Sequence, residues 1–363
     1  MQEGRQIPDS QTLRVSIAMA TYNGERFLVE QLHSLANQTK LPYELVVCDD
    51  CSEDDTLRLV RDFASQAPFP VHIHPNPQRT FYHVNFWRAA SLCSGDLFAF
   101  CDQDDVWLPD KLSRCAGEFE ADPDVLVVLH NSRVVDEQLN DLGRSHLSIS
   151  RRFVTSPRRP TPAGQAHGFA LMARRELADV FDSLGDVGLK RTSHDIAAFI
   201  LGDALGKLVF LPNRLVLYRQ HTKNFAGIGD QVTRRQWGRI STQRDADQEA
   251  ENLRNFANVA RSYSVLCEEL RNDPLAHVVP ISARMVAART SMWRKEAERY
   301  ERRADLYAAR PGSLQAIGRL VSDGLRGDYG LRVRHRMGLG SLVRDLLYLM
   351  GILDIARRRL KFP

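Results

Sequence analysis

Short apolar runs alternate with amphipathic stretches along the first half of the chain. Runs of this length, rich in Val, Ile, Leu and Phe, are typical of buried strands. They lie at residues 15–20, 44–48, 71–73, 97–101 and 125–129. Between the first two runs, Leu28, Leu32 and Leu35 recur at the spacing of one helix face. Strands that alternate with helices in this way predict a doubly wound, mostly parallel α/β sheet.

The pattern changes after about residue 220. Two further short strands are predicted at 208–211 and 215–217, and from residue 231 onward the apolar positions follow a helical period. We therefore expect an α/β domain over residues 1–229, followed by a helical region over residues 230–363.

A cluster of carboxylates follows the apolar run at 97–101. Asp102, Asp104 and Asp105 fall within four residues, and Asp102 and Asp104 can point the same way because alternate residues leaving a strand share a face. Two oxygen ligands on a loop suit Mg²⁺ or Mn²⁺ that carries a phosphate. The alternative is a solvated acidic turn before a helix, and Asp105 is expected only to begin that helix.

A second acidic pair, Asp49 and Asp50, ends the run at 44–48. The carboxyl ends of parallel strands meet at one edge of a sheet, so this pair and the Asp102–Asp104 pair should line the same edge, where α/β proteins bind ligands. No Gly-x-Gly-x-x-Gly follows the first strand, and no P-loop pattern occurs in the chain. These absences disfavour a dinucleotide dehydrogenase and a P-loop enzyme.

Two more candidates stand at predicted element ends. Asp195 precedes an apolar helix, where it could equally be a helix N-cap. His221 follows the strand at 215–217, and a lone histidine there is more often an ordinary hydrogen-bonded residue than a ligand.

Composition is that of an ordinary globular protein, with 43% hydrophobic and 26% charged residues. The six cysteines show no paired metal-finger spacing, so a zinc site is disfavoured. The first 14 residues contain no apolar secretory segment. Together these features predict a cytoplasmic protein.

The net charge of +4 is unevenly distributed. Residues 294–363 contain 16 basic and 8 acidic side chains, whereas the rest of the chain has 33 and 37. Leu342–Leu360 is too short to span a bilayer, but its apolar run and Arg357–Arg359 fit an interfacial helix. Contact with the inner face of the cytoplasmic membrane and simple packing of these helices are both open.

Four separated motifs carry a resemblance to a known family. They are residues 19–24 (Met-Ala-Thr-Tyr-Asn-Gly), 47–56, 102–107 (Asp-Gln-Asp-Asp-Val-Trp) and 218–221 (Tyr-Arg-Gln-His) with Asn224. In order and spacing, they resemble the family 2 inverting glycosyltransferases with the GT-A fold, most closely the bacterial rhamnosyltransferase-like members. The resemblance covers about residues 15–227 and implies a GT-A domain, while the helices expected after Gly229 lie outside it.

The resemblance also implies roles for individual residues. It assigns the nucleotide-sugar to Thr21, Tyr22, Asn23, Asp50, Asp102 and Gln103. Asp50 would accept the N3–H of uracil or thymine, and Tyr22 would lie beside the base. Asp104, Asp102 and His221 would hold Mg²⁺ or Mn²⁺, with Asp102 facing either the ribose or the metal. Asp195 matches the catalytic base.

The implied function is transfer of a sugar from a dTDP- or UDP-sugar, such as dTDP-L-rhamnose, to a glycan or lipid-linked acceptor in bacterial surface-polysaccharide synthesis. The alternatives are a UDP-hexose or UDP-N-acetylhexosamine transferase, and a non-catalytic subunit of a glycan-assembly complex. We expect no nucleic acid among the partners. Residues 131–133 read Asn-Ser-Arg where relatives often have a Ser-Asp pair, so the acceptor side departs from the family pattern.

Overall fold

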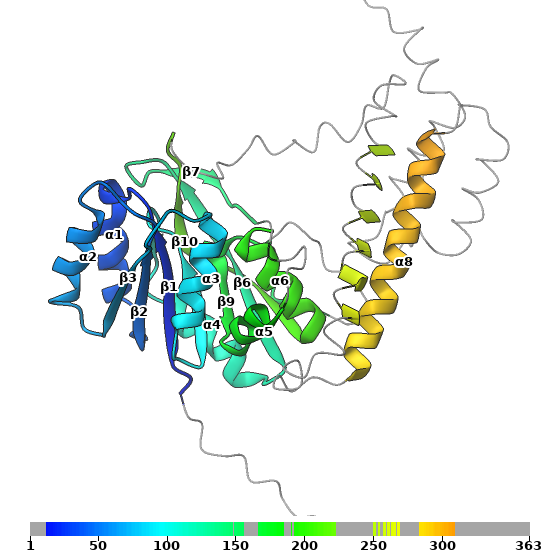
Figure 1. The fold of residues 1–363 in the computed structure, drawn as a ribbon, viewed down its shortest axis with the longest axis horizontal. Coiled ribbons are helices and arrows are strands. Elements are labelled where there is room, and N and C mark those ends of the chain that lie inside the picture. Colours follow the sequence, from blue (N-terminus) through cyan, green and yellow to red (C-terminus); the bar gives the residue numbers. More distant parts are fainter. Residues whose placement is uncertain are drawn as a thin grey trace, which may run out of the picture. The chain divides into compact units, whose positions relative to one another are not determined.

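The computed structural model describes residues 12–147, 149–155, 166–184, 190, 192–222 and 283–308, together with helical residues scattered through 250–268 (Figure 1). The chain divides into two compact units. One comprises Met1–Ser156, Ala163–Ile228 and Asn272–Met285, and the other comprises Pro157–Pro162, Gly229–Arg271 and Val286–Pro363. The predicted interfacial helix Leu342–Leu360 lies outside the described residues.

The first unit is built on a ten-stranded sheet with the main order β3-β2-β1-β4-β9-β6-β10-β5. The four strands of its first half are parallel to one another: β1 (Val15–Thr21), β2 (Glu44–Asp49), β3 (Val71–Pro75) and β4 (Leu97–Cys101). These are the strands that the apolar runs predict. The mostly parallel α/β sheet is therefore confirmed.

The second half of the sheet contains both directions. β6 (Val125–Val135) and β10 (Lys207–Arg219) are parallel, while β9 (Leu171–Arg174) lies antiparallel between β4 and β6. The two strands predicted at 208–211 and 215–217 are wrong in one respect, because they form the single strand β10 with register shifts around Pro212 and Asn213. The remaining strands are β5 (Val106–Trp107), β7 (Asp141–Arg144) and β8 (Phe153–Val154).

Helices cover both faces of this sheet. The helices are α1 (Glu25–Ala36), α2 (Thr56–Ala64), α3 (Tyr82–Leu92), α4 (Lys111–Ala121), α5 (Glu176–Ser183) and α6 (His194–Leu205), with the 3-10 turn η1 (Gly168–Ala170) before β9. Figure 1 shows α3, α5 and α6 together on one side.

The alternation of side chains along β1 and β4 explains these two layers. On one face, Ile17 and Met19 share a buried cluster with Leu32 of α1 and Leu112 of α4. On the opposite face, Phe100 of β4 lies edge-on to Trp87 of α3, with ring centroids 5.6 Å apart. Both sides of the strands are buried, as the continuous apolar runs predict for a parallel sheet.

The second unit contains α8 (Ala283–Ala308) from Val286 onward, together with the helical residues within 250–268. Tyr263 packs on Trp293 with ring centroids 4.5 Å apart, and Arg294 pairs with Glu268. Among the described residues, no helix combines the length and the apolar character needed to cross a membrane.

Candidate active site

The end of β1 is held by the side chain of Gln103. The Tyr22 N–H donates to Gln103 Oε1 at 2.9 Å, and Gln103 Nε2 donates to the Tyr22 carbonyl at 3.0 Å. A Cβ at Gly24 would lie 2.3 Å from Gln103 Oε1, so a larger residue there would displace the Gln103 side chain from these two hydrogen bonds. Gln103, which the sequence assigns to the nucleotide-sugar, thus couples the β1 end to the loop after β4.

The two carboxylates after β2 have different environments. Asp49 is fully buried and accepts hydrogen bonds from the Thr21 hydroxyl (2.8 Å) and from the Ser52 N–H and hydroxyl (2.9 and 2.6 Å). Asp50 accepts through Oδ1 from the Asn76 amide (2.8 Å) and from the Thr80 N–H and hydroxyl (2.7 and 3.0 Å). Within the described part of the chain, the hydrogen bonds to the Asp50 side chain all end on Oδ1, so Oδ2 can accept one from a ligand.

The loop before α3 adds residues that the sequence analysis missed. The Arg79 guanidinium lies 3.8 Å from the centroid of the Tyr22 ring. Three residues later, at the first position of α3, burial raises the pKa of Tyr82, and the charges of Asp195 and Asp102 add to that shift. One short segment therefore contacts the Asp50 side chain through Thr80 and approaches Asp195 through Tyr82. No recognised motif covers this segment, which explains why the sequence did not single it out.

The three carboxylates after β4 are also distinct. Burial, followed by the charges of Asp104 and Asp195, raises the pKa of Asp102 to about 8. Asp104 Oδ2 lies 2.8 Å from Nε2 of His221, with the two side chains 19% and 8% exposed. Asp105 is fully buried and accepts the Arg219 N–H through Oδ1 at 3.0 Å. The expectation that Asp105 only begins a helix is therefore wrong: α4 begins at Lys111, and Asp105 ties the loop to β10.

Arg219 completes this connection. Its Nε donates to the Asp104 carbonyl at 2.8 Å, its Nη1 donates to the Glu137 carbonyl at 2.7 Å, and its Nη2 pairs with Glu30. The guanidinium also lies over the Phe27 ring. Because Arg219 precedes His221 by two residues, these bonds place the histidine beside Asp104.

Asp195 lies in the first turn of α6. Ser193 occupies the N-cap position, and Asp195 Oδ1 accepts the Ile196 N–H at 2.7 Å as well as the Ser193 hydroxyl. The carboxylate also acts on the pKa values of Asp102 and Tyr82. It therefore stabilises a helix terminus and lies close to the acidic loop, so the two sequence interpretations are not exclusive.

Asp104 and His221 fit a divalent cation in donor type, since carboxylate oxygen and imidazole nitrogen suit Mg²⁺ or Mn²⁺. Asp102 lies near enough for the charge of Asp104 to raise its pKa, a repulsion that a cation would relieve. In the described part of the chain, no group of three or more His, Cys, Asp or Glu side chains could hold a metal ion by itself. Water and a diphosphate would complete the coordination, as is usual for Mg²⁺.

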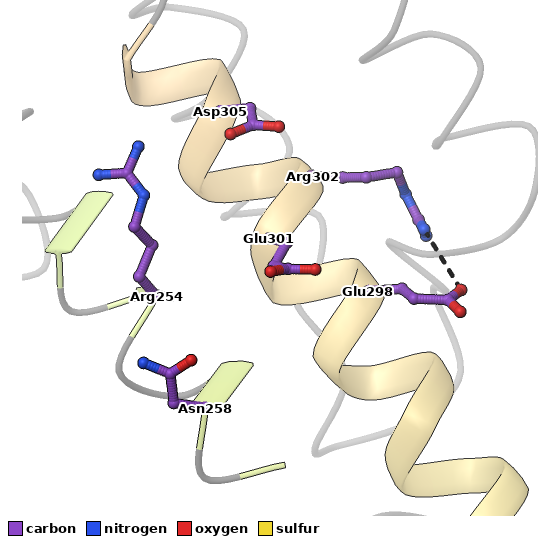
Figure 2. Close-up of a pocket in the computed structure, with 6 residues that line it drawn as sticks. All are labelled: Arg254, Asn258, Glu298, Glu301, Arg302 and Asp305. Carbon is purple, nitrogen blue, oxygen red and sulfur yellow. Dashed lines mark ion pairs between the residues drawn. The ribbon is translucent and has the colours of Figure 1, made fainter. Parts of the chain in front are cut away.

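A cavity of about 510 Å³ lies in the second unit and contains none of these residues. It is lined by Arg254, Asn258, Glu298, Glu301, Arg302 and Asp305 (Figure 2). Charges of both signs line it, and Arg302 pairs with Glu298 at 3.9 Å. A polar cavity of this kind lacks the apolar walls that ligand sites usually have.

The geometry of the first unit defines a class of protein. Polar side chains gather at the carboxyl ends of β1, β2 and β4, where α/β enzymes bind nucleotides. Residues 16–181 match the model of glycosyl transferase family 2. The match therefore identifies a glycosyltransferase family 2 domain over residues 16–181.

The sequence matches to individual relatives cover only part of each relative's length. The chain is 36% identical over 100 residues to the dTDP-rhamnosyl transferase RfbG of Shigella flexneri, covering 26% of this chain and 35% of that protein. It is 31% identical over 127 residues to an uncharacterised glycosyltransferase of Nostoc, covering 34% of this chain and 38% of that protein. The matches thus span about a third of the length of these curated relatives.

The fold extends over more of the chain than the sequence matches do. The crystal structure of S. aureus TarS residues 1–349 aligns with a TM-score of 0.52 at 14% identity, covering 96% of this chain and 93% of that one. At this identity the likeness concerns the fold, and it confirms the GT-A fold that the resemblance implies.

Proposed function

We propose that this protein is a metal-dependent inverting glycosyltransferase that uses a dTDP- or UDP-sugar. The observation that carries the proposal is the convergence of three groups at one sheet edge: Asp50, the Asp104–His221 pair and Asp195. A nucleotide, a diphosphate with its cation and an acceptor hydroxyl each need one of these groups.

The nucleotide would occupy the ends of β1 and β2. Asp50, held by Thr80 and Asn76, keeps one carboxylate oxygen for the N3–H of uracil or thymine. Cytosine has no N3–H, so this contact selects among pyrimidines. Tyr22 flanks the base, Thr21 and Asn23 line the same end of β1, and Asp102 with Gln103 faces the ribose. TarS, whose fold this chain shares, has been solved with UDP.

Asp104 and His221, with Asp102, would hold the cation. When bound, the cation would neutralise the negative charge that develops on the departing diphosphate. No side chain would then have to protonate the diphosphate. The role of Arg219 and Asp105 is to hold the acidic loop and the end of β10 together.

Asp195 would act as the general base. It removes the proton of the acceptor hydroxyl while that oxygen bonds to the anomeric carbon and the bond from this carbon to the diphosphate breaks, which inverts the configuration. General base catalysis of this kind typically contributes about 10²–10⁴-fold. The acceptor is a glycan or lipid-linked saccharide, and the match to RfbG supports dTDP-L-rhamnose as the donor.

A donor panel tests the proposal. The full-length protein is incubated with dTDP-L-rhamnose, UDP-glucose and UDP-N-acetylglucosamine, with Mn²⁺ or with EDTA, and release of the nucleoside diphosphate is measured. We expect metal-stimulated release from one donor. Metal-dependent nucleotide binding without release from any donor would favour the non-catalytic assembly subunit, and absence of both would contradict the proposal.

The basic excess from Arg294 onward supports a second, separable part of the proposal, namely peripheral contact with the inner face of the cytoplasmic membrane. Sedimentation with vesicles of phosphatidylglycerol and phosphatidylcholine tests it. We expect binding that rises with the anionic lipid fraction and falls with salt, and equal binding to neutral vesicles would contradict it.

A further inference from the structure

Phe27 packs against the histidine of the proposed cation site. It lies in the first turn of α1, just past the motif at 19–24, and its side chain is buried. The centroid of its ring is 4.9 Å from that of the His221 imidazole, and the two planes are inclined by 35°. The same imidazole carries the Nε2 atom that lies 2.8 Å from Oδ2 of Asp104. One residue of α1 therefore contacts the ring whose nitrogen faces the acidic loop.

Two guanidinium groups hold the Phe27 ring in place. The Cζ atom of Arg26 lies 4.7 Å from the ring centroid, and that of Arg219 lies 4.4 Å from it. A cation within about 6 Å of an aromatic centroid is attracted to the negative face of the ring. Both guanidinium groups also bind Glu137: Arg26 pairs with its carboxylate at 2.6 Å, and Arg219 donates to its carbonyl at 2.7 Å. The ring is thus fixed by contacts that join α1, the turn after β6 and the end of β10.

Phe27 differs in its surroundings from the neighbouring apolar residues of α1. Leu28 and Leu32 belong to the large buried cluster that packs against the sheet, and Phe27 is not a member of that cluster. Two of the described contacts of the Phe27 ring are instead with Arg219 and His221, at the end of β10. Its packing therefore concerns the site more than the core.

A histidine that binds a cation needs its imidazole held in one orientation. Rotation of an imidazole about the Cβ–Cγ bond has broad energy wells, so the backbone alone does not fix where Nε2 points. Metal-binding histidines are usually oriented by a partner outside the metal site, and loss of such a partner typically costs about 10–100-fold in metal affinity. Arg219 fixes the backbone two residues before His221 through its bond to the Asp104 carbonyl. The Phe27 ring restrains the imidazole itself.

We propose that Phe27 is a positioning residue that holds the His221 imidazole with Nε2 facing Asp104, so that both side chains can bind one divalent cation. Phe27 acts only through His221 and touches neither the cation nor the substrate. This inference rests on the proposed function, because the cation that the two side chains share belongs to that function. It gives the first turn of α1, which no motif covers, a task in the active site.

Binding of a nucleoside diphosphate with and without Mn²⁺ tests this role without any measurement of transfer. The probe is UDP or dTDP, whichever the wild type binds more tightly, and calorimetry gives its affinity in Mn²⁺ and in EDTA. Phe27→Leu removes the ring and keeps an apolar side chain. We expect it to reduce the gain in affinity on adding Mn²⁺ by about ten-fold, the lower end of the range for such partners. Its affinity in EDTA should equal that of the wild type.

Two further variants of this position separate the effect of the ring from the filling of space. Phe27→Tyr keeps the ring, so it should keep the Mn²⁺ gain of the wild type. Phe27→Met fills the space with a flexible apolar side chain and should lose the gain as Phe27→Leu does. The result therefore does not depend on the folding of a single variant.

The matched control is Phe63→Leu, which removes a buried ring from α2, where Phe63 packs on Phe69 with centroids 6.1 Å apart. It should lower the free energy of unfolding, as Phe27→Leu does, and leave the Mn²⁺ gain unchanged. A wild-type gain that Phe27→Leu and Phe27→Met retain, or that Phe27→Tyr or Phe63→Leu also loses, would overturn the role of Phe27 alone. Equal affinity of the wild type in Mn²⁺ and in EDTA, or no nucleotide binding, would overturn the cation site of the proposed function, and this inference with it.

Discussion

Nε2 of His221 lies 2.8 Å from Oδ2 of Asp104, although 117 residues separate them in the chain. This contact joins the loop after β4 to the end of β10, and we propose it as the core of a cation site. Asp104→Asn removes one carboxylate charge at nearly constant size. We expect it to reduce the gain in UDP affinity on adding Mn²⁺ by about 10–100-fold, measured by calorimetry.

The control for that experiment is Asp62→Asn, an exposed carboxylate on α2. It should leave the Mn²⁺ effect unchanged. Equal UDP affinity of the wild type in Mn²⁺ and in EDTA would rule out the cation role of Asp104.

Asp195→Asn tests the general base. Asparagine keeps an oxygen to accept the Ile196 N–H, so the start of α6 should persist. Transfer should fall by about 10²–10⁴-fold because the amide cannot take a proton. Nucleotide affinity should stay the same, and a parallel loss of nucleotide binding would instead assign Asp195 a purely structural role.

Asp50→Asn tests recognition of the base. The variant still accepts hydrogen bonds from Thr80 but presents an amide to the pyrimidine. We expect affinity for UDP and dTDP to fall about ten-fold or more, which corresponds to about 1.4 kcal/mol, and affinity for CDP to change less. Competition binding with the three nucleotides gives the ratio, and an unchanged ratio of UDP to CDP affinity would place the base elsewhere.

Arg219→Ala tests the link between the acidic loop and β10. The guanidinium is 1% exposed and donates to the Asp104 and Glu137 carbonyls. Removing it leaves these carbonyls without their donor, so we expect the free energy of unfolding to fall by on the order of 2–4 kcal/mol. The control is Arg114→Ala, which removes an exposed ion pair with Asp110. It should lower the free energy of unfolding by less than about 1 kcal/mol in the same denaturant titration.

His194 predicts how stability depends on pH. Burial lowers its pKa to about 4, in a ring stacked on Phe86 at 3.9 Å. The unfolded chain protonates this group near pH 6.5. Between pH 4 and pH 6.5, His194 is protonated in the unfolded state but neutral in the folded state. The contribution of neutral His194 to the free energy of unfolding is therefore fully present above about pH 6.5. It is lost as the pH falls toward 4, by on the order of 3 kcal/mol.

His194→Phe should remove that part of the pH dependence while keeping the aromatic packing. Thermal or denaturant unfolding at several pH values between 4 and 7 measures the slope for both proteins. Identical slopes would show that the imidazole does not stay neutral in the folded state.

The local pattern of the sequence predicted the framework of the site. Apolar runs of five or six residues are typical of the strands of parallel sheets, which are buried on both faces, and parallel strands bring their carboxyl ends to one edge. Asp50 and Asp102 could therefore be placed on the same edge from their positions after two such runs, and β2 and β4 do flank β1 there. The GT-A fold and the family followed from motifs at these strand ends.

Pairing between distant segments needed the tertiary structure. β9 has four residues and could have joined any edge, yet it lies antiparallel between β4 and β6. The residues of the predicted strands at 208–211 and 215–217 became one strand because β6 continues to Val135 and offers a partner past the irregular residues. Strand order depends on such non-local contacts, which hydrophobic periodicity does not encode.

The same distinction applies to single side chains. The position of Asp104 after a predicted strand made it a candidate from the sequence, whereas His221 became a candidate only through the resemblance to the family. That Gln103 clasps the Tyr22 backbone, that Asp105 accepts the Arg219 N–H and that Phe27 packs on His221 were decided by folding. Each of these contacts joins residues more than 20 positions apart, and its geometry depends on the packing of the whole sheet and its helices.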